Sequence, residues 1–266
     1  MTERTAELER ENGVAEPEEE SGKMSFLEHL DELRKRIVRI VTYLGIGFIG
    51  CYYYHKPIYN FLRKPIDEAL KANGGQLMYT KPTEAFVLYM KVAFVTAIFV
   101  TIPLSLYEVW RFIAPGLYRR EKKYVVPFLV SSIFLFVAGG AFCYFYVLPQ
   151  AYRFLIDMGK DFIPMISINE YWDMTLMMLV GFGLIFEMPV IVAFLSIWGL
   201  VTANFLWTKF KYAVIAMVAL AAILSPTGDI FNLILWTAPM IVLYLLSILV
   251  AALFGMSRKR REAAKA

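Results

Sequence analysis

Acidic and basic side chains gather in one short stretch near the start of an otherwise apolar chain. Residues 25–36 have the sequence SFLEHLDELRKR, and Ser25 with Glu28 three residues later is typical of the capping box that begins a helix. On that helix the apolar residues fall near one face and the charged residues on another. A helix divided in this way lies along a bilayer surface before it turns into the membrane. The pattern predicts a binding surface for charged groups at the rim of a membrane protein.

A second candidate for chemistry is Glu187, the one charged residue in the apolar window 174–208. An ionisable group near the middle of a membrane span costs at least about 2.5 kcal/mol and is normally functional. Pro189 follows two residues later, lacks a backbone N–H and should bend or break the helix, which frees the carbonyl group of Ile185. Together these residues predict a polar notch inside the bilayer that water can reach.

Other reactive residue types occur without partners. His29 and His55 are isolated, with no second metal ligand at a useful spacing. Cys51 and Cys143 fall toward the outer ends of predicted helices, and we expect buried free thiols rather than a disulfide bond. The sequence shows no glycine-rich phosphate loop and no Ser or Cys nucleophile beside a His. We therefore expect no enzyme, no metal site and no cofactor.

Long apolar windows place these groups in a membrane. The chain is 59% hydrophobic with a mean hydropathy of +0.55, far above an ordinary soluble domain. A helix needs about 20 apolar residues to cross a hydrocarbon core of roughly 30 Å. Three windows are long enough for one span each: 124–152, 174–208 and 230–257.

Three shorter windows complete the expected set. The windows near 37–54 and 86–107 qualify as spans if Arg39 and Lys91 extend to the lipid headgroups. The window 212–224 would form a helix of only about 20 Å before a Ser-Pro-Thr-Gly-Asp turn. The sequence thus predicts an all-α polytopic membrane protein with six transmembrane helices, the fifth of them short.

The distribution of Lys and Arg predicts the orientation. Roughly twice as many of these residues flank the spans on the side of the two termini as on the other side. The positive-inside rule then places both termini in the cytoplasm. The net charge of +4 and the pI of 8.9 reflect this basicity at the membrane surface, and we expect no nucleic-acid partner.

The composition divides the chain into three parts. Residues 1–24 are rich in Glu and poor in apolar residues, as in a disordered acidic tail. Residues 25–256 form the membrane domain, and residues 257–266 form a basic cytoplasmic tail. The outer loops at about 55–85 and 148–172 are long enough for small capping helices. We expect Asp229, in the turn before the sixth span, to cap that helix.

Several sequence blocks resemble the TatC family, the receptor subunit of the twin-arginine protein translocase. The resemblance covers roughly residues 24–256, with the blocks in the same order. These blocks are HLDELRKR at 29–36, VWRFIAPGLYRREKKYVVPFLVSSIFLF at 109–136, FGLIFEMPV at 182–190, and the shorter PTEAF at 82–86, AFCYFYVLPQA at 141–151 and SPTGD at 225–229.

The resemblance implies a fold and a function. Similar proteins have a kinked, concave six-helix bundle with short fifth and sixth helices, and they bind the adjacent arginines in the signal peptide of a folded cargo protein. The positions that match the signal-binding acids are Glu32 and Glu121, and Phe112 matches an aromatic residue of the recognition patch. Arg34, beside Glu32, is placed in the same site. Carboxylates suit this task because the planar fork of Arg pairs with them in a bidentate way.

Both acids also have a plain structural interpretation. Glu32 lies four residues before Arg36, an arrangement that favours an ion pair within one helix. Such a pair stabilises a helix by about 0.2–0.5 kcal/mol. Glu121 lies between Arg120 and Lys122 and could simply moderate the charge of a basic loop. From the residues alone, these interpretations stay open.

The resemblance also implies partners. These are TatA- and TatB-like single-span proteins, further copies of the chain in a receptor complex, and the lipid bilayer, with transport driven by the proton-motive force. Glu187 would make a polar contact with a partner's transmembrane helix; the alternative is a bond to a neighbouring helix of the same chain. A small-molecule secondary transporter is the rival class, but such proteins place several polar groups at the midplane, often in repeated halves.

Overall fold

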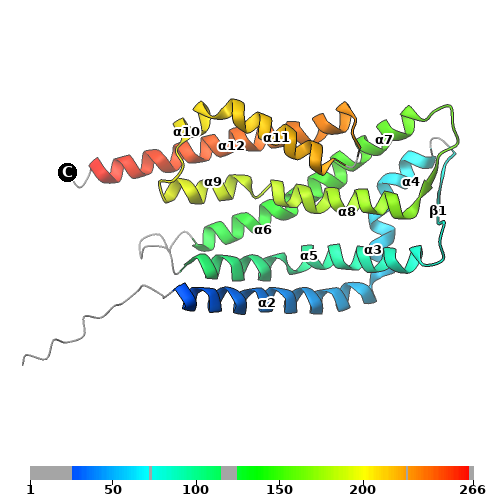
Figure 1. Ribbon diagram of the computed structural model, residues 1–266, viewed down its shortest axis with the longest axis horizontal. Coiled ribbons are helices and arrows are strands. Elements are labelled where there is room, and N and C mark those ends of the chain that lie inside the picture. Colours follow the sequence, from blue (N-terminus) through cyan, green and yellow to red (C-terminus); the bar gives the residue numbers. More distant parts are fainter. Residues whose placement is uncertain (1–25, 72–73, 115–124, 226, 264–266) are drawn as a thin grey trace, which may run out of the picture.

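The computed structural model describes residues 26–71, 74–114, 125–225 and 227–263 of the 266-residue chain. Helices make up nearly all of this part, and the long ones lie side by side in one bundle (Figure 1). Figure 1 also shows α2 beginning and α12 ending at the same end of the bundle, here called the terminal end. The opposite end, which carries α3, α4 and β1, is called the capped end. The acidic segment 1–24 lies outside the described residues.

The helices and strands are α2 (Phe26–Tyr53), α3 (His55–Leu62), α4 (Lys64–Lys71), β1 (Gln76–Met78), α5 (Glu84–Ile113), α6 (Val125–Phe142), η3 (Cys143–Val147), α7 (Leu148–Met158), β2 (Met165–Ser167), α8 (Ile168–Ile185), α9 (Met188–Ile197), α10 (Ala203–Thr208), α11 (Phe210–Leu224) and α12 (Ile230–Ala263).

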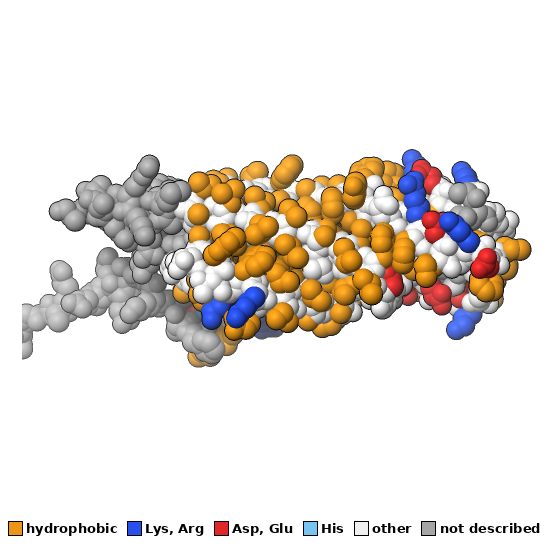
Figure 2. All heavy atoms as spheres, turned by 90° about the horizontal axis from the view of Figure 1, so that it is seen from above, with side chains coloured by type: hydrophobic (Ala, Val, Ile, Leu, Met, Phe, Trp, Pro, Cys, Tyr) orange, Lys and Arg blue, Asp and Glu red, His pale blue; other side chains and the backbone are white. Residues whose placement is uncertain are grey.

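The bundle has the apolar exterior of a membrane protein. Within the described residues, four helical segments are long and apolar enough to span a bilayer by themselves, and the bent pair α2–α3 adds a fifth if it counts as one span. The fifth expected span, α11, has 15 residues and rises only about 22 Å, as predicted for a short helix. Figure 2 shows hydrophobic side chains over the middle of the molecule and charged side chains gathered at the capped end. The exposed side chains include Phe134, Phe145, Ile215 and Ile223, each at least 66% exposed, and lipid would cover them.

The first helix corrects one expectation. Its charged start was predicted to lie along the membrane surface, but α2 is a continuous helix of 28 residues. The sharp bend lies at its other end, where α3 turns by 83° from α2. One face of α2 packs closely on α5: Gly47 lies so near Thr101 and Ala97 that a Cβ atom there would approach the Thr101 methyl group to 2.6 Å. Small residues at such a contact let two helices pack tightly in a membrane.

Tyrosine hydroxyl groups fasten the capped end. The hydroxyl of Tyr144 donates a hydrogen bond of 2.6 Å to the carbonyl group of Phe61, and that of Tyr171 donates one of 3.2 Å to the carbonyl group of Leu62. These are carbonyl groups at the C-terminal end of α3, which lack partners within that helix. α3 and α4 are the small capping helices expected in this loop. The pairing of β1 with β2, a parallel ladder of three residues each, was not foreseen in an all-α prediction.

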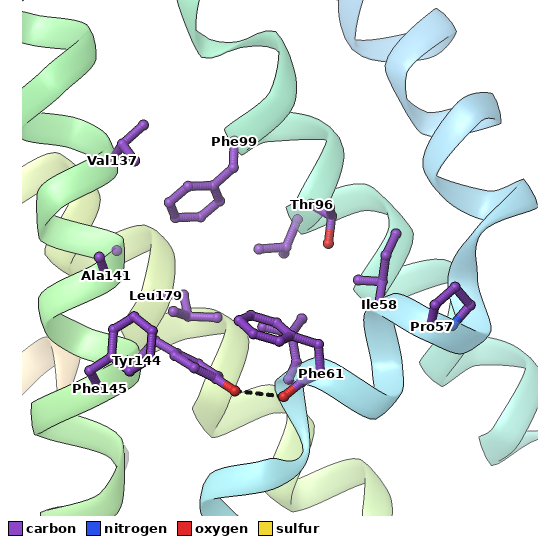
Figure 3. A pocket seen from close by; sticks show the side chains of 13 residues that line it. Pro57, Ile58, Phe61, Thr96, Phe99, Val137, Ala141, Tyr144, Phe145 and Leu179 are labelled. Atoms are coloured by element: carbon purple, nitrogen blue, oxygen red, sulfur yellow. Dashed lines mark hydrogen bonds between the residues drawn. The ribbon is translucent and has the colours of Figure 1, made fainter.

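A π-helical turn interrupts the third span. Cys143–Val147 form η3, and Pro149 follows it. A proline ring cannot donate to the residue four positions earlier, here Phe145, and it crowds that carbonyl group, so the turn widens. Figure 3 shows Tyr144 and Phe145 of this region beside Phe61 and Phe99 at an apolar hollow of about 520 Å³. Cys143 and Cys51 are buried and free, which confirms the expected thiols.

The fourth span breaks where Pro189 predicted. α8 ends at Ile185, and α9 begins at Met188. Next to this break α6 and α8 pack very closely: a Cβ atom on Gly139 would lie 2.5 Å from the carbonyl oxygen of Phe182 and 2.9 Å from the Phe186 ring. The break therefore sits against a tight contact between two helices.

Asp229 begins the last helix as expected. Its carboxylate accepts a hydrogen bond of 2.7 Å from the backbone N–H of Asn232 and one of 2.9 Å from the Asn232 side chain. The helix that follows corrects the expectation of a short sixth span, because α12 has 34 residues, of which Ile230–Leu253 are the apolar part. The basic segment beyond Leu253 continues the helix through Ala263 since it contains good helix formers and no proline.

Candidate functional site

The charged start of α2 docks against the end of α5. Arg36 is 8% exposed and donates a hydrogen bond of 2.6 Å from Nη1 to Oε2 of Glu108 on α5. Its Nη2 donates one of 2.8 Å to Oε1 of Glu32, one turn earlier on α2. The guanidinium fork of Arg36 thus joins an acid on its own helix to an acid on the neighbouring helix. The ion pair between Glu32 and Arg36 that the sequence suggested is present.

Glu32 keeps part of its acceptor capacity. Oε1 is bonded to Arg36, whereas Oε2 has no hydrogen-bond partner among the described residues and is buried. An ionised carboxylate can accept about four hydrogen bonds. A buried carboxylate oxygen that has no donor has lost its bonds to water without replacing them, which costs free energy. The carboxylate borders a polar pocket of about 520 Å³. This pocket is lined by Glu28, Asp31, Glu32, Lys35, Arg36 and Arg39.

Aromatic rings lie at the same end of the bundle. Phe112, near the end of α5, stacks on the ring of His29 from α2 with centroids 4.4 Å apart and an angle of 16°. His29 precedes Glu32 by three residues, so it lies on nearly the same helix face. The structure thus brings Phe112 and Glu32 to one region of the α2–α5 contact. Arg34 is exposed on α2.

The second predicted acid cannot be placed. Glu121 lies outside the described residues, in the segment 115–124. That segment joins the end of α5, which carries Phe112 and Glu108, to the start of α6. Both flanking helix ends lie at the terminal end of the bundle (Figure 1).

Glu187 lies at the break between α8 and α9, which are different helices from the α2 and α5 of the site above. The residue is 9% exposed, and its Oε1 has no hydrogen-bond partner among the described residues. The hydroxyl group of Ser132 on α6 interacts with the same carboxyl group. A neighbouring helix of the same chain thus satisfies part of this acid and leaves one oxygen unpaired.

Sequence reasoning missed Glu108. It is 2% exposed, and besides Arg36 it accepts hydrogen bonds from Tyr43 at 3.2 Å and from Arg39 at 3.5 Å. The available signal was its position, since it directly follows the apolar window that ends at Tyr107. An acid at that place needs a buried partner or contact with water.

Among the described residues, no group of three or more His, Cys, Asp or Glu could hold a metal ion.

The arrangement of charged and aromatic side chains at this end suits the binding of cations. A carboxylate with a free oxygen, a polar pocket beside it and an aromatic ring nearby form a surface that accepts guanidinium or ammonium groups. The fold around it is a helical bundle with several apolar spans. These features define a multi-pass membrane protein with a charged surface at its terminal end.

Comparisons with known proteins name the family. The sequence model of the family described as "Sec-independent protein translocase protein (TatC)" matches residues 28–239, and the chain belongs to that family. A TatC protein of Koribacter versatilis is 48% identical over 247 residues, which cover 91% of each chain. TatCy of Bacillus subtilis is 36% identical, over 86% of this chain and 89% of that protein.

A solved structure has the same fold. The crystal structure titled "Crystal Structure of Twin Arginine Translocase Receptor- TatC" superposes with a TM-score of 0.76 at 33% sequence identity. The match covers 85% of this chain and 99% of that one. The protein is thus a multi-pass membrane component of a Sec-independent protein translocase, and this role in protein transport outweighs the rival small-molecule transporter.

Proposed function

We propose that this protein is the receptor that captures signal peptides with two adjacent arginines at the terminal end of the bundle. The observation that carries the proposal is Oε2 of Glu32, which has no hydrogen-bond partner among the described residues and lies beside a polar pocket. An arriving guanidinium group can donate to this buried oxygen once a movement of the Glu32 side chain uncovers it, while Oε1 stays bonded to Arg36. Binding then needs no prior breakage of the contact between α2 and α5.

A ligand with two adjacent arginines is best bound by two carboxylates, one for each guanidinium group. Glu32 supplies one carboxylate, and Glu121 supplies the second from the segment that joins α5 to α6. Phe112, held by its stacking on His29, packs against the apolar side of the signal. Arg34, exposed on α2, donates hydrogen bonds to carbonyl groups of the bound peptide. The apolar part of the signal then enters the bilayer along the bundle.

The terminal end faces the cytoplasm in this proposal, with both termini on that side. The excess of Lys and Arg on this side of the spans supports the orientation. The start of α2 and the end of α12 lie at the same end of the bundle, as an even number of membrane crossings requires (Figure 1).

Assembly with single-span partners follows capture. The unpaired oxygen of Glu187 is suited to a polar group on the transmembrane helix of a TatB-like partner, because such a group is costly to leave unsatisfied in lipid. TatA-like partners and further copies of the chain complete the complex. The proton-motive force drives transport of the folded cargo.

Photocrosslinking tests the signal site. The full-length protein in native membranes is exposed to a signal peptide that carries a photoreactive group next to its two arginines. We expect wild-type protein to capture this peptide better than a peptide with two lysines, since Lys cannot pair in a bidentate way. The double substitution Glu32→Ala and Glu121→Ala should abolish the preference. Glu170→Ala, which removes an exposed acid of α8, is the matched control and should not. Equal capture by wild type and double variant would end the assignment.

A further inference from the structure

Glu108 is a buried acid for which the proposed function has no role so far. It is almost completely covered, yet it carries an ionisable group within a helix that spans the membrane. Three donors face it, all from α2: Arg36 at 2.6 Å, Tyr43 at 3.2 Å and Arg39 at 3.5 Å. A buried acid stays ionised only where it is paired with positive or hydrogen-bonding groups, so its partners indicate which charges it neutralises.

Four side chains joined by ion pairs, Glu32, Arg36, Glu108 and Arg39, balance in charge because Glu108 is present. Arg36 and Arg39 carry two positive charges, and the nearest acids that contact them are Glu32 and Glu108. With both acids ionised, this cluster is neutral. Without Glu108 it would carry one net positive charge within a turn of the free oxygen of Glu32. A cationic ligand would then meet one uncompensated positive charge beside Glu32, which lowers both its affinity and its rate of association.

The geometry of Arg36 links this balance to the ligand site. One of its terminal nitrogens contacts Glu108 and the other contacts Glu32. If Arg36 had no second acid, its whole charge would act on Glu32. The second acid shares that charge, so Glu32 still attracts a further cation.

We propose that Glu108 is a positioning residue for the signal site: it neutralises the basic side chains of α2 so that Glu32 can accept a guanidinium group of the ligand. This inference rests on the proposed function. It differs from a purely structural role, in which Glu108 only ties α2 to α5. A structural role depends on the bonds, whereas the proposed role depends on the net charge of the cluster.

A double-mutant cycle separates the two roles. Glu108→Gln keeps the size and the polar character of the side chain but gives the cluster one net positive charge. Arg39→Gln, at a side chain that is 49% exposed, removes one positive charge at little cost to packing. The double variant is neutral again. Glu84→Gln is the matched control, because Glu84 is also a buried acid of α5 but lies at the helix start, where it accepts hydrogen bonds from Thr80.

The measurement is the dissociation constant of a fluorescent peptide with two adjacent arginines and an apolar segment, on purified full-length protein in lipid nanodiscs. We expect Glu108→Gln to weaken binding about tenfold at low salt, and by less at high salt, because salt screens charge at the surface. The double variant should return to within about threefold of wild type, as restored neutrality requires. Glu84→Gln should bind as wild type does. Thermal unfolding of each variant reports its fold independently.

The outcomes are distinct. Wild-type affinity in Glu108→Gln would overturn the inference, and so would a double variant as weak as the single one, since lost contacts rather than net charge would then explain the defect. Either result leaves the signal site itself intact, provided that Glu32→Gln still weakens binding. If wild type shows no preference for the two arginines over two lysines, the proposed function fails, and the inference fails with it.

Discussion

Arg36 and Glu108 form an ion pair of 2.6 Å although 72 residues separate them in the sequence. Both side chains are buried, and Arg36 also binds Glu32. One arginine therefore connects the packing of α2 on α5 with the acid at the candidate signal site. Changes at this arginine affect stability and recognition together, whereas changes elsewhere in the bundle separate them.

Loss of Arg36 should destabilise the protein. Among the described residues, Arg36→Leu leaves buried Glu108 with Tyr43 at 3.2 Å and Arg39 at 3.5 Å as donors, and breaking a buried pair from one side costs about 3–5 kcal/mol. The midpoint of thermal unfolding in detergent would show this loss. Lys35→Leu is the control, because the Lys35–Asp31 pair is exposed and contributes little. A double variant Arg36→Leu with Glu108→Leu should be more stable than Arg36→Leu alone; if it is not, the buried charge is not the cause.

Close packing of α6 against α8 predicts a steric effect at Gly139. Gly139→Ala places a methyl group 2.5 Å from the backbone oxygen of Phe182, which cannot move without shifting the helix. Such overpacking costs about 1–3 kcal/mol. Gly50→Ala is the matched control: it lies in α2 with nothing within 4 Å of the added atom, so it should be neutral or stabilising by up to about 1 kcal/mol. Equal unfolding midpoints for both variants would contradict the close contact.

The hydroxyl group of Tyr144 should stabilise the capped end. Tyr144→Phe leaves the carbonyl group of Phe61 without this donor and should cost about 1–2 kcal/mol. We expect faster amide hydrogen exchange in α3 and α4, measured by mass spectrometry, with little change in α12. Tyr146→Phe is the control, since that side chain is 62% exposed on the same turn. Unchanged exchange in α3 would show that the hydrogen bond does not hold this end.

The cap of α12 should depend on pH. Burial of Asp229 opposes ionisation, but the hydrogen bonds from Asn232 more than offset it, so the pKa of Asp229 lies below its usual value. A lowered pKa means that the cap stabilises the fold fully above the ordinary value of about 3.9 and loses this contribution as the pH falls through the lowered pKa.

Thermal unfolding from pH 6 to pH 3 tests this dependence. Asp229→Ala should be less stable than wild type by about 1 kcal/mol near pH 6, and the difference should shrink on acidification. Asp229→Asn caps without titrating, so its difference from Asp229→Ala should stay constant. A difference between wild type and Asp229→Ala that grows toward low pH would show the opposite sign and refute the mechanism.

The sequence predicted features that depend on neighbouring residues. The short α11, the break before Pro189 and the cap by Asp229 follow from local hydropathy, a missing N–H and a turn motif, and the structure confirms each of them. The family of the chain was also identified from local blocks, which the comparisons confirm.

Contacts between distant segments were beyond such reasoning. Lys91 was considered only as a residue that extends to the lipid headgroups, and the sequence did not indicate that its Nζ lies 3.0 Å from Asn169 and 2.5 Å from Asp173 on α8. The pairing of β1 with β2, the straight course of α2 and the burial of Glu108 likewise depend on partners far along the chain. Periodicity shows which face of a helix is polar, but not which side chain on another helix will meet that face. The roles of Glu32, Glu121, Phe112, Arg34 and Glu187 remain predictions.

The two oxygens of Glu32 differ in their surroundings: Oε1 is bonded to Arg36, and Oε2 has no hydrogen-bond partner among the described residues. If a signal peptide binds Glu32 as proposed, the bond to Arg36 stays in place, so repeated binding and release would leave the helix packing unchanged. Release would then require breaking only the hydrogen bonds to the second oxygen.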